Sequence, residues 1–328
     1  MSADITKIRA EIIGGAGYAG GELIRLLLRH PHVETAAVQS ASSAGKPIYS
    51  VHKDLVGETE IVFSDKVSGD SDVLFLCMGH GQANEWLQNN RVNPNTKIID
   101  LSQDFRYTEN TDFIYGLPEL RRDAVRTEKK HIANPGCFAT AVQLALLPLA
   151  AAHVLSSDIH ATAITGSTGA GQNLSPTSHF SWRSQNVQIY KPFDHQHLRE
   201  IRISLQLASA SNVPPLHFIP VRGNFTRGIH ASLVTKTSLD HREAVKLFSE
   251  YYRTHYFVTV LPEGLPELKM VTQTNKCVIG IEVKNDMLLI VSVIDNLLKG
   301  AAGQAVQNMN LLFDFPETCG LMLKSSGF

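Results

Sequence analysis

The chain has few of the features that define several other classes of protein. Its 328 residues include only four cysteines, and no two of them form a CxxC pair, so neither a disulfide framework nor a thiolate metal site is expected. Its 30 basic and 31 acidic residues leave a formal net charge of -1, which gives no field to collect nucleic acid or anionic lipid. We therefore expect small molecules as binding partners.

Long hydrophobic runs are also missing. The opening residues, MSADITKIRAEIIGG, have no apolar signal core, and the most apolar stretch, residues 144–155, is too short and too interrupted to span a bilayer. This pattern predicts a cytoplasmic protein. The length of 328 residues exceeds what one hydrophobic core usually holds, so two domains are expected.

The first third of the chain alternates short apolar runs with helical patterns. The runs IRAEIIGG, VETAAVQS, DVLFLCMG and KIIDLS are typical of strands, and GGELIRLLLRH and GQANEWLQNN are typical of helices. Strands that alternate with helices form βαβ units. We therefore predict an α/β domain with a parallel sheet.

The pattern changes after an apolar helix that begins near Phe138. Longer strands are predicted in IHATAITG, LHFIPVRG, GIHASLVTKT and CVIGIEVKNDMLLIVSVID, the last with a hairpin turn at Asn285 and Asp286. Residues 240–255 have the apolar spacing of a helix that covers a sheet, and residues 296–313 predict a final helix that packs back on the first domain. A mostly antiparallel second domain is expected.

A glycine-rich turn, GGAGYAGGEL, joins the first strand to the first helix. Gly14, Gly17 and Gly20 follow a GxxGxxG spacing, with Tyr18 and Ala19 between the last two. Glycines there let the backbone approach a pyrophosphate, and the helix N-terminus attracts it with N–H groups and a dipole. The turn predicts a dinucleotide site, and a glycine turn without a ligand is the alternative.

The loop after the second strand, VQSASSAGK, distinguishes between cofactors. An acidic residue there would bind the ribose 2′-hydroxyl of NAD, and none is present. Ser40, Ser42, Ser43 and Lys46 can instead donate hydrogen bonds to a phosphate. The loop favours NADP, and a solvated serine loop is the alternative.

The segment HIANPGCFATA places Cys137 after a Pro-Gly turn, at the start of the apolar helix. A helix N-terminus lowers the pKa of a thiol because it favours the thiolate, which is the nucleophilic form. Cys137 is therefore a candidate nucleophile, with a packing role as the alternative. The other cysteines lie in apolar strand or terminal contexts and are expected to be structural: Cys77, Cys277 and Cys319.

A nucleophile needs a proton-transfer partner, and DHQHLREI is the densest histidine segment. His197 and Glu200 are three residues apart, so on a helix the carboxylate can orient the imidazole as a base. His195 and His197 also form an HxH pair that can bind a metal. No third ligand stands at a recognisable spacing, and no metal is predicted.

Two further stretches carry donors that suit phosphate or carboxylate. IDLSQDFR supplies Ser102 and Arg106 at the end of a strand, and GNFTRG supplies Arg227 beside a glycine. The forked donors of arginine match both kinds of anion. A surface ion pair is the alternative for each arginine.

Together these motifs resemble the N-acetyl-gamma-glutamyl-phosphate reductase family, of the wider aspartate-semialdehyde dehydrogenase group. The segments GGAGYAGGEL, DLSQDFR, YGLPEL, NPGCFATA, TGSTGAG, HQHLREI, PVRGNFTRGI and DNLLKGAAGQAVQNMN occur in the family's order. The resemblance implies an α/β protein with a Rossmann dinucleotide-binding domain, residues 1–137 plus 296–328. It also implies a glyceraldehyde-3-phosphate-dehydrogenase-like α+β catalytic and dimerisation domain, residues 138–295.

The resemblance further implies NADP as cofactor, a homodimer or homotetramer, and a role for each matched residue. Cys137 matches the nucleophile and His197 the general acid/base. The matched substrate contacts are Ser102 and Arg106 at the phosphate, Arg227 at the carboxylate, and His195. The matched cofactor-binding residues are Gly14, Gly17, Tyr18, Ala19, Gly20, Ser40, Ser42, Lys46, Ser167, Gly169, Asn296 and Lys299.

Three places depart from the family pattern. Phe138 and Ala139 stand where Tyr-Pro commonly follows the cysteine, which keeps an aromatic ring. Ala41 stands where an arginine is often found after the second strand, which weakens the case for NADP. Arg199 replaces the proline of the histidine motif, so recognition of the acyl group of the substrate can differ.

The implied reaction belongs to arginine biosynthesis. It is the NADPH-dependent reduction of an N-acyl-glutamyl 5-phosphate to the 5-semialdehyde, with release of phosphate through a thioester on Cys137. Two alternatives stay open: the same chemistry on aspartyl phosphate or an N-acyl-aminoadipyl phosphate, and a dinucleotide-sensing regulator without turnover. No motif distinguishes an acetyl from a succinyl substrate.

Overall fold

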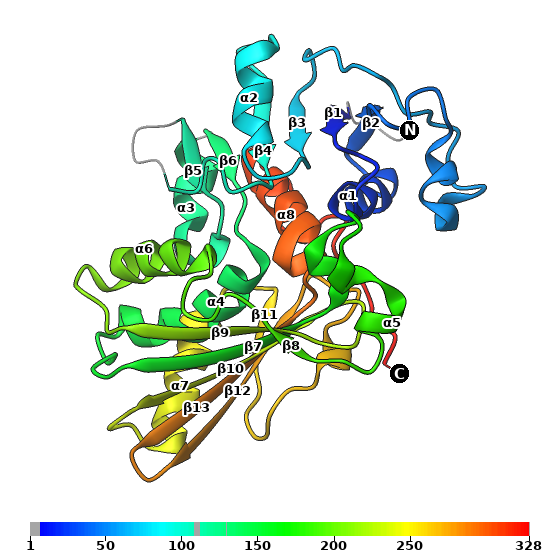
Figure 1. Ribbon diagram of the computed structural model, residues 1–328. Coiled ribbons are helices and arrows are strands. Elements are labelled where there is room, and N and C mark those ends of the chain that lie inside the picture. Colours follow the sequence, from blue (N-terminus) through cyan, green and yellow to red (C-terminus); the bar gives the residue numbers. More distant parts are fainter. Residues whose placement is uncertain (1–6, 108–111, 129, 328) are drawn as a thin grey trace. The chain divides into compact units, whose positions relative to one another are not determined.

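The computed structural model describes residues 7–107, 112–128 and 130–327 (Figure 1). Contacts between residues divide the chain into two compact units. The first comprises Met1–Pro135 and Ala301–Met322, and the second comprises Gly136–Gly300 and Leu323–Phe328. The divisions at 135/136 and 300/301 lie a few residues from the positions expected from the sequence, 137/138 and 295/296. The last residues, 323–328, group with the second unit, whereas the boundaries expected from the sequence place them in the first domain.

The first unit is built on a six-stranded sheet of order β2-β1-β3-β4-β6-β5, and every pairing in it is parallel. The predicted parallel sheet is confirmed. β3 is a continuous apolar run because each of its residues is buried, as in a sheet covered on both faces. The strands are β1 (Ile8–Ile13), β2 (Val33–Gln39), β3 (Val73–Leu76), β4 (Lys97–Asp100), β5 (Phe113–Tyr115) and β6 (His131–Ala133).

The helices of the first unit include the one predicted near the C-terminus. Helix α2 packs through Ala83 on Leu74 and Leu76 of β3. Helix α8 contacts both α1 and α3, and Nε2 of His30 lies 2.9 Å from Oδ1 of Asn310 in α8. The described bounds are α1 (Tyr18–Leu28), α2 (Gln82–Asn89), α3 (Pro118–Glu128) and α8 (Gly303–Leu312). The final helix therefore joins the first unit, as the sequence predicts.

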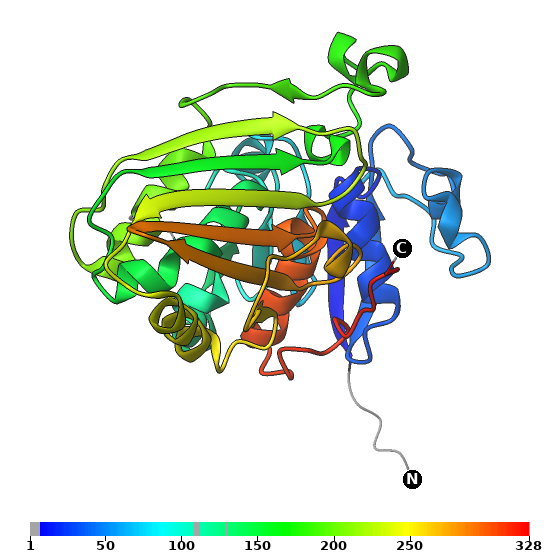
Figure 2. The same cartoon turned by 90° about the horizontal axis from the view of Figure 1, so that it is seen from below.

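The second unit is built on a seven-stranded sheet of order β11-β12-β13-β10-β7-β9-β8 (Figure 2). Its pairings are antiparallel except β7 with β9 and β11 with β12, so the mostly antiparallel prediction is confirmed. Asn285 begins the predicted hairpin turn with a φ of 56°. The strands are β7 (Ile159–Thr165), β8 (Gln188–Ile189), β9 (Leu216–Arg222), β10 (Ile229–Lys236), β11 (Val258–Val260), β12 (Cys277–Lys284) and β13 (Met287–Ile294).

Helix α4 (Cys137–Ala151) forms the centre of the core of the second unit. Residues 138–150 are all buried, which explains an apolar run with no polar face. The helix contacts β10 and β13, and it is flanked by α6 (His197–Ser209) and α7 (His241–Tyr252). A short helix, α5 (Phe180–Arg183), precedes β8. In the described part of the chain, no helix is long and apolar enough to cross a membrane.

Candidate active site

Cys137 is the first residue of α4, as the Pro-Gly turn predicts. Gly136 is the N-cap, with φ -74° and ψ 152°, and as a glycine it makes no side-chain cap bond. The thiol is neither buried nor fully exposed. Backbone N–H groups and the helix dipole stabilise negative charge at the N-terminal end of an α-helix such as α4. Cys137 therefore lies where a thiolate and an oxyanion are both favoured.

Glu200 holds the turn that presents Cys137. Its carboxylate Oε1 accepts a hydrogen bond of 2.7 Å from the backbone N–H of Gly136, and the side chain is 1% exposed. Glu200 lies in the first turn of α6, three residues after His197. The sequence predicts an orienting role toward His197, and the structure adds this bond to the residue preceding the cysteine. No sequence pattern indicates the bond, because it joins residues 64 positions apart.

The two predicted histidines and the residue after the cysteine form one aromatic cluster. The ring centroids of His195 and His197 are 4.7 Å apart, and the ring of Phe138 lies 5.5 Å from the first and 6.2 Å from the second. His197 begins α6, and its backbone N–H donates to Nδ1 of His195 over 3.2 Å. Phe138, the departure from Tyr-Pro, thus keeps its ring packed beside both imidazoles. Arg199, the departure in the histidine motif, is exposed on α6.

Tyr190 and Arg222 extend this cluster, and no sequence motif indicates either residue. The ring of Tyr190 lies 5.7 Å from that of His195, and the guanidinium carbon of Arg222 lies 4.6 Å from the Tyr190 centroid. Burial and the nearby Cys137 raise the pKa of Tyr190, which keeps the phenol neutral. A tyrosine five residues before the histidine pair is the only local signal.

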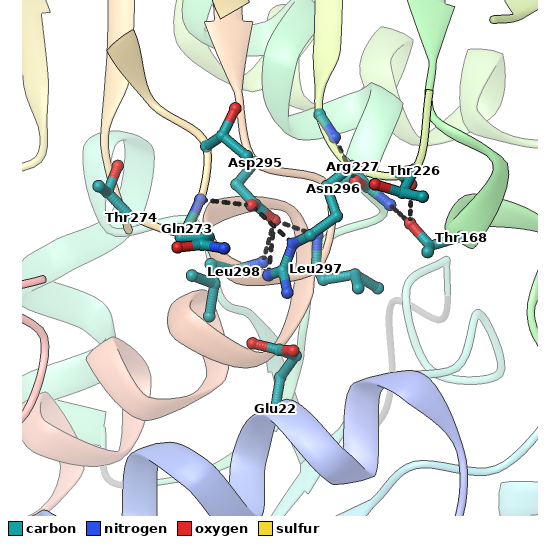
Figure 3. Close-up of polar contacts among 12 residues, drawn as sticks. Glu22, Thr168, Thr226, Arg227, Gln273, Thr274, Asp295, Asn296, Leu297 and Leu298 are labelled. Atoms are coloured by element: carbon teal, nitrogen blue, oxygen red, sulfur yellow. Dashed lines mark hydrogen bonds and ion pairs between the residues drawn. The ribbon is translucent and has the colours of Figure 1, made fainter. Parts of the chain in front are cut away.

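Arg227 forms an ion pair with a buried carboxylate. Its Nε and Nη2 donate to Oδ2 and Oδ1 of Asp295 over 3.0 and 3.2 Å, and the arginine side chain is 18% exposed (Figure 3). The predicted residue Asn296 comes next in the chain. Its Oδ1 accepts from the N–H of Gly228 over 2.6 Å, and its Nδ2 donates to Oγ1 of Thr168 over 3.0 Å. Asp295 and Asn296 therefore bring the Arg227 loop to the GSTGAG loop.

The remaining predicted cofactor residues of the second unit lie in two turns. Ser167 and Gly169 belong to a 3₁₀ turn, Ser167–Ala170, that hydrogen-bonds to the segment around Phe225. Lys299 belongs to a π-helical turn, Leu298–Ala302, and is fully buried, with its Nζ 5.8 Å from the Phe257 centroid. In the same turn, Gly300 packs closely against Cys137. The structure thus brings the π-helical turn, but not an exposed Lys299 amine, to Cys137.

Ser102 and Arg106 lie in the first unit and are both nearly buried. Arg106 donates from Nε to the carbonyl oxygen of Asn134 over 2.8 Å and from Nη2 to that of Leu101 over 2.9 Å. Ser102 donates from its N–H and its hydroxyl to the carboxylate of Asp100. Burial raises the pKa of Asp100 to about 6, and the Ser102 bonds and Arg106 oppose that rise. Both predicted residues are therefore rigidly placed.

The glycine-rich turn has the geometry that a pyrophosphate needs. Gly14 has a φ of 78°, and a Cβ on it would lie 2.6 Å from the carbonyl oxygen of Cys77. A Cβ on Gly20 would lie 2.6 Å from the carbonyl oxygen of Gly14. Gly17 caps α1 without a side-chain bond, and a Cβ on it would meet no atom nearer than 3.5 Å. The residues present therefore fit a dinucleotide phosphate at the start of α1, beside Tyr18 and Ala19.

His52 supports this turn from a distant part of the chain. Its Nε2 lies 2.8 Å from the carbonyl oxygen of Gly15, and its side chain is 6% exposed. Burial lowers the pKa of His52, so its neutral form donates to Gly15. His52 could not be predicted as part of this turn, because no sequence motif links it to residue 15.

The serine loop is a compact turn with both buried and exposed donors. The N–H groups of Ser43 and Lys46 donate to the carbonyl oxygens of Ser40 and Ser43 over 3.2 and 3.1 Å. Ser40 and Ser43 are buried, whereas Ser42 and Lys46 are exposed. Exposed hydroxyl and ammonium donors after β2, without an acid, fit the 2′-phosphate of NADP. Within the described residues, no three histidine, cysteine or acidic side chains group into a metal site.

Comparisons with known proteins agree with this arrangement. Residues 9–128 match the family described as semialdehyde dehydrogenase, NAD binding domain, and residues 137–296 match semialdehyde dehydrogenase, dimerisation domain. The chain is similar in fold to aspartate semialdehyde dehydrogenase II of Vibrio cholerae, with a TM-score of 0.72, 16% identity, and coverage of 94% of this chain and 99% of that one. The Candida albicans aspartate semialdehyde dehydrogenase with NADP gives 0.69, with 16% identity and the same coverage.

Closer relatives carry a more specific name. Proteins named N-acetyl-gamma-glutamyl-phosphate reductase from Christiangramia forsetii and Parabacteroides distasonis are 51% and 53% identical to this chain. A protein of that name from Bacteroides thetaiotaomicron is also 53% identical. Each match covers 98% of this chain and 100% of the relative. The chain therefore belongs to the N-acetyl-gamma-glutamyl-phosphate reductase family of the semialdehyde dehydrogenases.

Proposed function

We propose that Cys137 is the nucleophile and His197 the general acid/base of an N-acetyl-gamma-glutamyl-phosphate reductase. The reaction is the NADPH-dependent reduction of N-acetyl-glutamyl 5-phosphate to the 5-semialdehyde, with release of phosphate, in arginine biosynthesis. The observation that carries the assignment is Cys137 at the start of α4, with the His195 and His197 cluster beside its neighbour Phe138. A nucleophile, a proton donor and a charge-stabilising helix end thus meet in one unit.

The first half of the reaction releases phosphate. The thiolate of Cys137 attacks the acyl carbon, a carbon–sulfur bond forms, and the phosphate oxygen leaves with the bonding pair. N–H groups at the start of α4 stabilise the oxyanion of the tetrahedral intermediate. We assign Ser102 and Arg106 to the departing phosphate, because both are rigidly placed and arginine binds phosphate through two donors. A thioester on Cys137 results.

The second half reduces that thioester. Bound NADPH supplies a hydride to the thioester carbon. The same N–H groups hold the oxyanion of the thiohemiacetal on Cys137. When the carbonyl re-forms, the carbon–sulfur bond breaks, and His197 donates its proton to the departing sulfur. We assign Arg227 to the substrate carboxylate and His195 to a substrate contact next to His197.

The cofactor has its own set of residues. We assign the pyrophosphate to the turn of Gly14, Gly17 and Gly20, and the 2′-phosphate to Ser40, Ser42 and Lys46. We assign the nicotinamide end to Ser167, Gly169, Asn296 and Lys299. Asn296 supports that assignment through its bonds to the Gly228 and Thr168 loops, which fix the lip of the site. The buried amine of Lys299 acts there through the π-helical turn that it belongs to.

The domain roles and the assembly are also proposed. Residues 1–137 with 296–328 bind the cofactor, and residues 138–295 carry the catalytic and oligomerisation functions of a cytoplasmic homodimer or homotetramer. The dimerisation-domain description of the family matched by residues 137–296 supports the second role. Sedimentation measurements at several protein concentrations will distinguish the two oligomers, and a monomer at all of them would contradict the proposal.

The reverse reaction tests the function. Purified enzyme is given NADP, phosphate and a panel of semialdehydes: N-acetyl-glutamyl, N-succinyl-glutamyl, aspartyl and N-acetyl-aminoadipyl. We expect the fastest phosphate-dependent NADP reduction with the N-acetyl-glutamyl compound, and a loss of about 10³-fold or more in the Cys137→Ser variant. Cys319→Ser, a part-exposed cysteine elsewhere, is the matched control and keeps full activity. Preference for another semialdehyde, or NADP binding without any turnover, would refute the assignment.

A further inference from the structure

The proposed reaction gives no task to Asp295, which is a fully buried carboxylate. Asp295 follows the last residue of β13 and is 0% exposed. An ionised carboxylate in such a place is costly unless nearby donors compensate for its lost hydration. The hydrogen-bond partners of Asp295 therefore indicate which role its carboxylate has.

Five donors from three segments converge on this carboxylate (Figure 3). Arg227 supplies two of them, from Nε and Nη2. The backbone N–H of Gln273 donates to Oδ2 over 2.8 Å. Those of Leu297 and Leu298 donate to Oδ1 over 2.8 and 3.1 Å. Both oxygens are thus bonded on several sides, and the carboxylate cannot rotate without breaking several bonds.

The contact with Arg227 sets the direction of the guanidinium. Asp295 takes the edge formed by Nε and Nη2, which is the side-on arrangement of an arginine–carboxylate pair. Because the guanidinium is planar, this arrangement turns its Nη1 end away from Asp295. An anion bound at that end would meet a group whose orientation is already fixed.

The other contacts of Asp295 lead to the nucleophile. The N–H groups of Leu297 and Leu298 introduce the π-helical turn, and the N–H of Gly300 in that turn donates to the backbone oxygen of Asp295 over 2.9 Å. A Cβ on Gly300 would lie 2.8 Å from the Cβ of Cys137. One residue therefore connects the Arg227 guanidinium with the backbone that packs behind Cys137.

We propose that Asp295 is a positioning residue that holds the Arg227 guanidinium in register with Cys137, so that the enzyme selects substrates with a carboxylate. This rests on the proposed function, in which Arg227 meets the substrate carboxylate. A fixed guanidinium loses little conformational entropy on binding, so its orientation contributes to affinity as well as its charge. A role confined to stability would lower the melting temperature without changing the choice of substrate.

The test measures, in the reverse reaction, how strongly the enzyme prefers a substrate with a carboxylate over one without it. Its two substrates are N-acetyl-glutamate semialdehyde and 4-acetamidobutanal, the same molecule without the carboxylate. The ratio of their kcat/KM values is the selectivity. We expect Asp295→Asn and Arg227→Lys each to lower selectivity about 10-fold to 100-fold, mainly by raising KM for the carboxylated substrate. The double variant should lose no more than Arg227→Lys alone, because the two residues act through one contact.

The outcomes distinguish the proposed role of Arg227, binding the substrate carboxylate, from that of Asp295, orienting Arg227. If Arg227→Lys lowers selectivity and Asp295→Asn lowers kcat/KM equally for both substrates, the role of Asp295 is refuted and that of Arg227 stands. The role of Asp295 is also refuted if the loss of selectivity in the double variant equals the product of the losses in the two single variants. If Arg227→Lys leaves selectivity unchanged, Arg227 does not meet the carboxylate and both claims about this pair fail, while the Cys137→Ser test of the chemistry is unaffected.

A second variant decides the matter if Asp295→Asn does not fold. Arg227→Ala keeps Asp295 and removes the guanidinium, so that millimolar guanidinium chloride can occupy the vacated position. We expect guanidinium to restore turnover of N-acetyl-glutamate semialdehyde several-fold, and an equal concentration of ammonium chloride to restore none, because only the planar ion matches the fork. Equal responses to the two salts would overturn the proposal.

Discussion

A substitution at Gly300 perturbs the position of Cys137, the proposed nucleophile, without changing its side chain. A Cβ on this residue would lie 2.8 Å from Cβ and 3.2 Å from Cα of Cys137, and 3.3 Å from the backbone oxygen of Asp295. None of these atoms ends a flexible side chain. A Gly300→Ala substitution therefore forces either the start of α4 or the π-helical turn to move.

The size of that movement follows from the distances. Ordinary contact begins at 3.4 Å, so the Cβ of Gly300→Ala is short of it by about 0.6 Å. Overpacking of this kind costs about 1–3 kcal/mol of the free energy of unfolding. A displacement of about half an ångström at a nucleophile lowers kcat roughly 10-fold to 100-fold, since a misplacement of about 1 Å can cost 10²-fold.

The assay is steady-state NADP reduction with thermal unfolding measured in parallel. Gly280→Ala is the matched control. Gly280 lies in β12, and a Cβ on it would lie 2.6 Å from the carbonyl oxygen of Gly264, so the overpacking is similar. We expect both variants to lose stability and only Gly300→Ala to lose kcat per folded molecule. Wild-type kcat in Gly300→Ala, or equal losses of kcat in both variants, would refute the packing argument.

Substitutions at three other positions test separate parts of the proposal. Glu200→Ala removes the acceptor of the Gly136 N–H, so it should lower the free energy of unfolding in urea by about 1–3 kcal/mol and lower kcat. Glu200→Gln keeps an acceptor oxygen and should lower both by less. Equal effects of the two substitutions would contradict the role of the bond. Gly20→Ala places a Cβ 2.6 Å from the Gly14 oxygen and should raise the Kd for NADPH at least about 10-fold in a fluorescence titration without unfolding the protein; an unchanged Kd would contradict the turn's role. Burial raises the pKa of Asp100 from 3.8 to about 6. The stability that this raised pKa adds to the folded state is therefore complete below pH 3.8 and is lost as the pH rises through 6. The unfolding free energy of wild type minus that of Asp100→Asn should therefore fall by up to about 3 kcal/mol between pH 4 and pH 7.5, and a flat difference would contradict the burial.

Local patterns predicted the features that depend on neighbours in sequence. The alternation of strands and helices in the first unit, the hairpin at Asn285 and the start of α4 at Cys137 all follow from periodicity and turn residues. Asn285 can take a positive φ, and Pro135 and Gly136 end an extended segment before a helix. Such features need no knowledge of the rest of the fold.

Contacts between residues far apart in the sequence could not be predicted from local patterns. The bonds of Glu200 to Gly136, His52 to Gly15 and Arg227 to Asp295 join residues 64, 37 and 68 positions apart. A carboxylate three residues after a histidine has two possible partners, and only the packing of α6 on α4 brings one of them within reach. The family resemblance proposes which residues touch ligands, whereas the residues that hold those side chains in place are seen only in the structure.

The proposed mechanism requires that a thioester forms on Cys137. This intermediate can be trapped by mixing the enzyme with N-acetyl-glutamyl 5-phosphate in the absence of NADPH, quenching with acid and measuring the intact mass. We expect one N-acetyl-glutamyl group per chain, located on the peptide that contains Cys137, together with release of one equivalent of phosphate, and neither in Cys137→Ser. An adduct on another residue, or turnover by Cys137→Ser at the wild-type rate, would contradict the account.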